Sequence, residues 1–281
     1  QTMSKKNQKK TLSNKSQLGM IAFRFSKNKL AMVGLSIIVL LMIICVFAPL
    51  YIDYSLVYKQ SMSIRLKGPG TPGHILGTDQ FGRDLLARII YGGRISLLAG
   101  LAVVGMALVV GVILGGIAGY FGGRADKIIC AVIDVAMAVP SLPLTMLLIA
   151  YLKSGMFSLI LAISITAWTG TARILRTRVK QICELPYIKI EKAMGVSAPV
   201  IMVRHILPNL KDILLTRMAL SVSSAMTTES GLSFLGLGTY GQKSWGNILH
   251  FAFFRNSILR KQIWWYLPPI ICISVAVMGF M

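Results

Sequence analysis

Acidic residues are scarce in this chain of 281 residues, which has 9 Asp or Glu against 30 Lys or Arg and a net charge of +21. Charged residues of both signs make up only 14% of the chain, whereas hydrophobic residues make up 55%. This apolar excess excludes an ordinary water-soluble domain. A basic surplus can indicate a nucleic-acid surface. Here the basic residues lie in the gaps between long apolar runs, which is typical of membrane loops, so we expect no nucleic-acid partner.

Sequence motifs that carry enzyme chemistry are also missing. The chain has no GxxxxGK[ST] phosphate loop, no HExxH and no GxSxG. A GxGxxG match at residues 236–241 follows an apolar helix rather than a strand, which argues against dinucleotide binding. The four cysteines have neither CxxC nor another metal-ligand spacing. We therefore expect a protein that is not an enzyme and that binds no metal or cofactor itself. The cysteines are Cys45, Cys130, Cys183 and Cys272.

Six long apolar runs predict an all-α, polytopic membrane protein. The first has 23 residues without a charge, and a helix of that length reaches about 34 Å, enough to cross a bilayer. Glycine recurs every fourth residue at Gly111, Gly115 and Gly119, which predicts close packing of one face of the second run against another helix. A Pro140-Ser-Leu-Pro143 segment interrupts the third run. The six runs are residues 30–52, 95–123, 128–152, 154–172, 213–237 and 263–281.

Basic residues also predict the orientation in the membrane. With the N-terminus inside, the cytoplasmic segments hold 19 basic residues and the external segments hold 11. We therefore expect a multi-pass protein of the cell membrane with both termini in the cytoplasm. Residues 1–29 form a basic cytoplasmic N-terminus that includes an amphipathic stretch before the first span, residues 30–281 form the six-span domain, and residues 53–94 are external. Trp245, Trp264, Trp265 and Tyr266 fit an aromatic belt at the outer interface.

The cytoplasmic segment 173–212 is the most informative part of the sequence. Helix-forming residues up to Met194, then Gly195, Ser197 and Pro199, predict two short helices joined by a tight turn, with a stop at Pro208. The segment is rich in apolar residues, which a solvated loop would not need. We interpret it as a docking element for a cytoplasmic partner.

This segment resembles the EAA loop of ABC-importer permeases, with Gly195, Leu207 and Pro208 at the places of the family's Gly and Leu-Pro. The resemblance extends over nearly the whole chain to the C-type permease of the peptide/opine/nickel importers. Two departures are a Lys189-Ile190-Glu191 triplet in place of Glu-Ala-Ala, and the absence of the family's polar tail, which we expect to follow Met281. Further matching motifs are Leu76-Gly77-Thr78-Asp79, Tyr91-Gly92-Gly93-Arg94, Arg204-His205-Ile206-Leu207-Pro208-Asn209, and Leu232-Ser233-Phe234-Leu235-Gly236 with Ser244-Trp245-Gly246.

The resemblance implies a transporter subunit with several partners. It would form a pathway with a second, B-type permease, rest on two cytoplasmic ATPases that bind ATP and Mg²⁺, and receive substrate from an external binding protein. The substrate is a di- or oligopeptide, or a nickel or metal-opine complex. A secondary transporter, or another polytopic membrane protein not driven by an ATPase, is the alternative from another class. The implied ATPase-coupling residues are Lys189, Ile190, Glu191, Ala193, Gly195, His205, Leu207 and Pro208.

Two acids lie inside predicted spans, where a charge in contact with lipid is costly. Asp134 and Glu229, with Ser233 close to the latter, are therefore candidates for the translocation pathway. A hydrogen-bonded packing acid and a proton relay are the two other roles that remain open. The external segment 78–94 is expected to fold against the outer mouth, where packing is the first interpretation and a gate or a contact with the binding protein are the alternatives.

Overall fold

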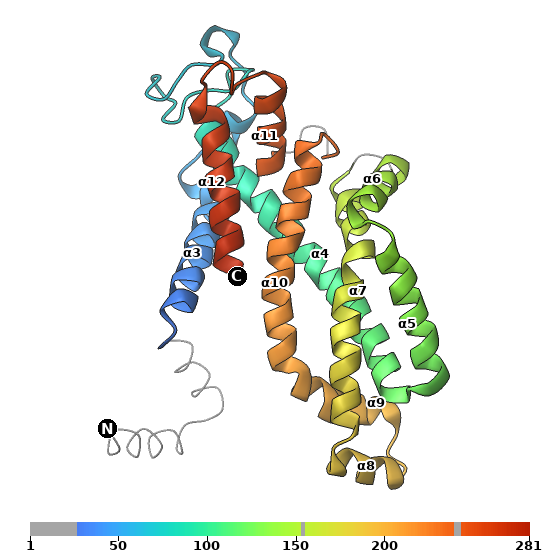
Figure 1. Ribbon diagram of the computed structural model, residues 1–281. Coiled ribbons are helices and arrows are strands. Elements are labelled where there is room, and N and C mark those ends of the chain that lie inside the picture. Colours follow the sequence, from blue (N-terminus) through green and yellow to red (C-terminus); the bar gives the residue numbers. More distant parts are fainter. Residues whose placement is uncertain (1–26, 153–154, 239–242) are drawn as a thin grey trace, which may run out of the picture.

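The computed structural model describes residues 27–152, 155–238 and 243–281, and within these ranges the chain is helical with no β-strand. The basic N-terminus and its expected amphipathic stretch lie almost entirely outside the described residues. Figure 1 shows an elongated bundle with α8 at one end and the loop 53–84 at the other. The α-helices are α3 (Lys29–Val46), α4 (Leu85–Phe121), α5 (Gly123–Ala138), α6 (Ser141–Leu152), α7 (Met156–Cys183), α8 (Pro186–Ala193), α9 (Ala198–Ile201), α10 (Leu207–Phe234), α11 (Trp245–Phe254) and α12 (Ile263–Phe280).

The six predicted spans correspond to helical segments of the structure. Four helices, α3, α4, α7 and α12, are long and apolar enough to cross a membrane. The bent pair of α5 and α6 is long and apolar enough when the two helices are taken together. The fifth expected span is α10, which has 28 residues and is about 42 Å long. It is less apolar because it carries many Ser and Thr side chains. The prediction of an all-α, polytopic membrane fold is confirmed.

Several helices extend beyond the apolar runs that predicted them. The N-terminus of α4 lies at Leu85, ten residues before the predicted start, where the Asp84 carboxylate accepts a hydrogen bond from the Ala87 amide. At its far end α7 continues to Cys183, past the predicted end at residue 172. The run boundaries were wrong because charged residues mark where lipid contact ends, whereas a helix ends only where its backbone geometry changes.

The third span is broken where the sequence has its Pro-rich interruption. α5 and α6 meet at an angle of 87° around Val139 and Pro140. Proline has no amide hydrogen and excludes the α conformation from the residue before it, and Val139 is accordingly extended. The bend places α6 across the bundle beside α7, as Figure 1 shows.

The glycine repeat of α4 forms a close helix contact. A Cβ atom on Gly115 would lie 2.6 Å from the carbonyl oxygen of Ala172, and one on Gly119 would lie 2.6 Å from that of Arg176. Both carbonyls belong to α7, so the backbones of α4 and α7 touch along this face. The predicted close packing is confirmed, and it is the kind of small-residue interface that membrane helices use.

The end of the molecule that contains the loop 53–84 and α11 is a folded cap rather than a set of free loops. Asp79 is 1% exposed, and its carboxylate accepts hydrogen bonds from the amides of Phe81 and Arg83 and from the Arg83 side chain at 2.7 Å. Trp245 of α11 is also 1% exposed and donates its indole N–H to the Ile89 carbonyl oxygen of α4. The prediction that Trp245 and Trp265 lie at the outer membrane interface was wrong, because both indoles are buried in the core.

Candidate functional site

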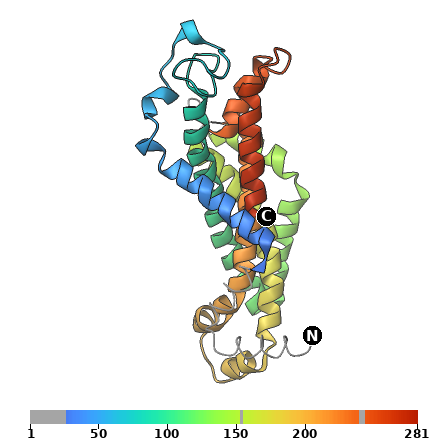
Figure 2. The same cartoon turned by 90° about the vertical axis from the view of Figure 1, so that its left-hand side faces the viewer.

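α8, α9 and the π-helical turn Met202–Ile206 form one packed body at the end of the bundle, here called the α8–α9 unit (residues 186–206). Gly195 joins α8 to α9 with a φ of +77°, a backbone conformation that is strained for other residues. The predicted pair of short helices with a tight turn is therefore present. In Figure 2 the unit lies at the lower end of the molecule, opposite α11 and the loop 53–84.

Apolar anchors fix the α8–α9 unit to the rest of the protein. Ile188, Ile201 and Ile206 are each 0% exposed. They pack with a cluster from the end of α7 and the start of α10. Full burial of one such side chain contributes about 1.5–3 kcal/mol, so the unit is held as a rigid extension of α7 and α10. The α7 and α10 residues of this cluster are Leu175, Val179, Cys183 and Leu210.

Polar contacts add a second set of ties, both within the α8–α9 unit and from it to the ends of α7 and α10. The Glu191 carboxylate lies 2.8 Å from His205 Nε2, which joins α8 to the π-helical turn. Asn209 donates a hydrogen bond to the Tyr187 hydroxyl and another to the His205 carbonyl oxygen. The exposed Lys189 pairs with Glu184 at 2.7 Å, and this ion pair lowers the pKa of the Glu184 carboxyl.

The outer surface of the α8–α9 unit is unusually apolar for an exposed helix pair. Ile190 is 59% exposed, Met194 is 68% exposed and Val203 is 66% exposed. Ala193 lies on the exposed surface beside them. Large apolar side chains gathered on one protruding element are typical of a protein-binding surface.

The junction between the α8–α9 unit and α10 differs from the prediction. A helix stop was predicted at Pro208, but the chain passes from α9 through the π-helical turn into α10 without leaving the helical conformation. The Leu207 amide donates to the carbonyl oxygen of Met202, five residues earlier. Pro208 has no amide hydrogen to donate, and it lies just after the π-helical turn, where the backbone hydrogen-bond pattern changes. The α8–α9 unit is thus continuous with the 28-residue helix α10.

α10 also lines a cavity of about 330 Å³ that is bounded by α4, α6, α7 and α10. Hydroxyl groups from three of these helices reach it, together with one guanidinium, that of Arg217. Among the residues that the structure describes, no acidic side chain lines it. Its polar lining residues are Ser141, Thr145, Thr166, Arg217, Ser221, Ser224 and Thr228.

Arg217 is the charged side chain of this cavity. Its Nε atom is buried and has no hydrogen-bond partner among the described residues. The arginine as a whole is only partly buried, and an anionic group entering the cavity would form charge-assisted hydrogen bonds with its guanidinium. In the sequence this arginine appeared only as a charge at the start of a span, and hydroxyl residues spread over three helices carried no signal that they would meet.

Glu229 lies outside this cavity, although its neighbour Thr228 lines it. The Glu229 side chain is 1% exposed, and its carboxylate accepts hydrogen bonds from Ser233 at 2.8 Å and from Ser96 at 3.1 Å. Ser96 belongs to α4, so the carboxylate ties α10 to α4. This geometry matches the hydrogen-bonded packing acid among the three roles considered for it.

Asp134 has a different setting. Its side chain is 65% exposed on α5 and forms an ion pair with Arg173 of α7. The neighbouring pair Asp126 and Arg176 makes a second link between the same helices. The structure therefore does not bring Asp134 together with Glu229 or Ser233.

The comparison with family models identifies the class of protein. Residues 111–281 match the model described as the binding-protein-dependent transport system inner membrane component. The chain belongs to this permease family. Residues 16–69 of the permease also match the N-terminal transmembrane domain of oligopeptide transport permease C. The protein is a permease component of an ABC importer, and it is a multi-pass membrane protein.

Curated relatives cover most of the permease. It is 40% identical over 226 residues to the oligopeptide transport system permease protein OppC of Bacillus subtilis, covering 80% of this chain and 73% of the relative. The dipeptide transport system permease protein DppC of the same organism is 36% identical, with 92% and 79% covered. OppC of Lactococcus lactis is 34% identical, with 97% and 93% covered.

A solved structure has the same fold. The permease matches a chain of the MetNI methionine ABC transporter in an inward-facing conformation, with a TM-score of 0.51 and 14% sequence identity. The match covers 68% of the permease and 97% of that chain. The predicted ABC-importer permease fold is confirmed.

Proposed function

We propose that this permease is the C-type subunit of an ATP-driven importer of di- and oligopeptides. It forms the membrane pathway with a second, B-type permease, and receives peptide from an external substrate-binding protein. Two cytoplasmic ATPases bind ATP and Mg²⁺, neither of which is held by this chain. The proposal rests on the relatives named for oligopeptide and dipeptide transport and on the cavity that α10 shares with α4, α6 and α7.

The continuity of α10 with the α8–α9 unit is the single observation that carries the mechanism. The exposed residues Ile190, Met194 and Val203 would rest in a cleft of an ATPase. When the ATPases close on ATP, the α8–α9 unit would move as a rigid body because its isoleucine anchors prevent it from moving alone. Since no break separates the unit from α10, that movement would pass along α10 to the cavity.

Arg217 supports a peptide as the substrate. A peptide carries a carboxylate at its C-terminus, and guanidinium groups bind carboxylates with paired, charge-assisted hydrogen bonds. The hydroxyl groups of Ser221, Ser224 and Thr228 would accept or donate hydrogen bonds to the peptide backbone without selecting a side chain. Such a lining suits the transport of peptides of varied sequence.

The coupling role also gives the orientation. ATPases are cytoplasmic, so the α8–α9 unit would face the cytoplasm together with both termini, in the cell membrane. The loop 53–84 and the turn between α11 and α12 would then face outward. This agrees with the excess of basic residues that the sequence places on the same side as the α8–α9 unit.

Uptake measurements test the proposal. Cells that lack this gene, cells that carry it, and cells that carry a variant without residues 187–197 would be given radiolabelled trialanine, nickel or a metal-opine complex in parallel. We expect the gene to restore trialanine uptake alone, and the deletion to remove it while the protein still inserts in the membrane. Restored nickel or metal-opine uptake without trialanine uptake would contradict the proposed substrate. Trialanine uptake by the deletion variant would contradict the coupling role of the α8–α9 unit.

A further inference from the structure

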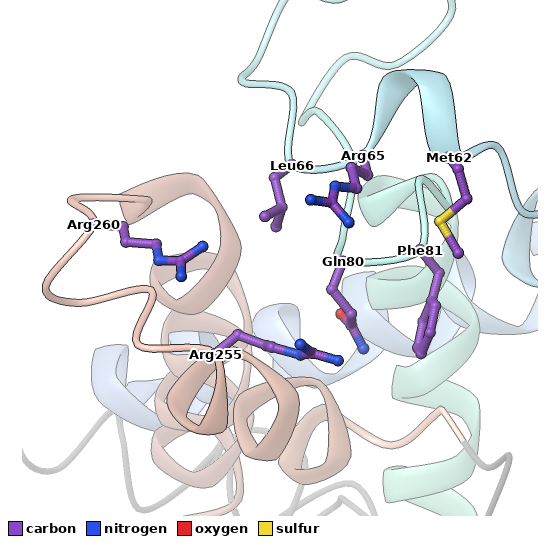
Figure 3. Close-up of a pocket in the computed structure, with 7 residues that line it drawn as sticks. All are labelled: Met62, Arg65, Leu66, Gln80, Phe81, Arg255 and Arg260. Carbon is purple, nitrogen blue, oxygen red and sulfur yellow. The ribbon is translucent and has the colours of Figure 1, made fainter.

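Three arginines meet around a second cavity, at the end of the molecule opposite the α8–α9 unit. The cavity has a volume of about 260 Å³ and lies between the loop 53–84 and the turn that follows α11. Figure 3 shows the guanidinium groups of Arg65 and Arg255 on either side of the Gln80 amide, with Arg260 facing the same space. Met62, Leu66 and Phe81 complete the lining.

The positive charges of this cavity are not neutralised by acidic side chains of the described residues. Arg65, Arg255 and Arg260 form no ion pair with any residue in the described ranges, and guanidinium groups stay protonated. Like charges held close together repel. The three acids of the loop have other partners: Asp79 binds Arg83, Asp84 binds His74, and Asp53 accepts hydrogen bonds from Ser55. The cluster is therefore short of negative charge.

Gln80 gives an independent sign that a ligand belongs here. Its side chain is 7% exposed, it lies in the cavity wall, and neither its amide nitrogen nor its amide oxygen has a hydrogen-bond partner among the described residues. A buried amide left without partners costs about 1–3 kcal/mol. An acceptor group in the cavity would take the amide hydrogens of Gln80 and leave its oxygen free to accept from a neighbouring arginine.

We propose that this cavity is a carboxylate-binding pocket that receives an acidic side chain of the substrate-binding protein when that protein docks. The inference rests on the proposed function, which supplies such a partner on this side of the membrane. The arginines would bind the carboxylate through charge-assisted hydrogen bonds. The pocket would thus fix the orientation of the docked protein over the permease.

The shape and the surroundings of the pocket favour a protein side chain. Its apolar wall of Met62, Leu66 and Phe81 matches the methylene groups that precede a glutamate carboxylate. The pocket is formed by cap segments and lies apart from the cavity that contains Arg217. Segments 53–94 and 243–262 together have ten basic and three acidic residues, so this end would attract an acidic partner surface.

The test measures docking of the binding protein to the complete transporter in nanodiscs. One variant combines Arg65→Gln, Arg255→Gln and Arg260→Gln, and a matched control combines Lys59→Gln, Lys67→Gln and Lys261→Gln, which removes the same charge from exposed positions of the same end. The dissociation constant is measured at low and high salt, in nanodiscs with and without anionic lipid. ATP hydrolysis without the binding protein reports whether each variant is folded and assembled.

We expect the arginine variant to weaken docking by at least about tenfold and to lose most of the salt dependence, while the control changes docking much less and hydrolysis without the binding protein stays unchanged. Equal effects of the two variants would overturn the proposal, because net charge alone would then explain them. If the arginine variant docks like the unaltered protein in nanodiscs without anionic lipid and differs from it only in nanodiscs with anionic lipid, the proposal is overturned in favour of a lipid phosphate. If docking is unchanged but the KM of transport for peptide is raised, it is overturned in favour of the peptide itself. If the unaltered complex imports no peptide, the proposed function fails instead.

Discussion

The proposed docking of an ATPase on the α8–α9 unit should be weakened by substitutions that leave the permease fold intact. Ile190 and Met194 are exposed, at 59% and 68%, and neither belongs to the apolar cluster that anchors the unit. Replacing both by alanine therefore removes apolar surface available to a partner and leaves the anchors Ile188, Ile201 and Ile206 in place. We expect this double variant to insert normally and to bind the ATPases more weakly.

The size of the effect follows from the exposed surface. Complete burial of one isoleucine or methionine side chain contributes about 1.5–3 kcal/mol, so the exposed fractions of the pair are worth about 2–4 kcal/mol if an ATPase covers them fully. Alanine retains one carbon and a cleft covers only part of the surface, so about half of this is lost, or about 1–2 kcal/mol. The affinity for the ATPase then falls by a factor of about 5–30.

Binding of the purified ATPases to permease complexes in nanodiscs measures this change. A control variant replaces Ile75 and Ile258, which are 72% and 55% exposed at the opposite end of the molecule, so that it removes a similar apolar surface. We expect the control to bind the ATPases as tightly as the unaltered protein. Equal affinities for the Ile190 and Met194 variant and for the control would refute the assignment of this surface.

Three further predictions concern the cavity and the helix contacts. Arg217→Gln should reduce uptake of peptides with a free C-terminus by about 10-fold or more, while Lys211→Gln, an exposed change on the same helix, leaves uptake unchanged; equal uptake by both variants would contradict the carboxylate role. Gly119→Ala should lower the thermal unfolding temperature because its Cβ would meet the Arg176 carbonyl oxygen, whereas Gly105→Ala, with nothing within 4 Å, should not. Glu229→Gln should keep the hydrogen bonds to Ser96 and Ser233 and most of the stability, whereas Glu229→Leu should cost about 1–3 kcal/mol; lost uptake with unchanged stability in Glu229→Gln would indicate a pathway role.

Features that depend on nearby residues were predictable from the sequence. Uncharged runs predicted the spans, Gly111, Gly115 and Gly119 predicted a close helix contact, and the Pro140 segment predicted an interruption. Each of these signals acts within a few residues, through lipid contact, side-chain size or backbone geometry. The resemblance of the segment around Gly195 to a known loop also predicted the family.

Features that depend on distant parts of the chain were not predictable. The 87° angle between α5 and α6 follows from packing against α7, which no local pattern encodes. The cavity with Arg217 collects hydroxyl residues from helices that are far apart in the sequence. Trp245 looked interfacial because aromatic residues are common at membrane surfaces, but α11 folds back and buries it against α4. The acids Asp134 and Glu229 attracted notice as rare charges, although the structure gives both of them partners.

ATP-driven uptake of radiolabelled trialanine into proteoliposomes tests the central claim most directly. The vesicles would contain both permeases and the ATPases with the binding protein outside, and this chain would be either unaltered or Gly195→Arg. Arginine at a φ of +77° strains the link between α8 and α9 and places a large side chain on the surface proposed to meet the ATPase. We predict uptake that requires ATP and is lost in the variant. Uptake that persists without ATP, or that the variant retains in full, would contradict the account.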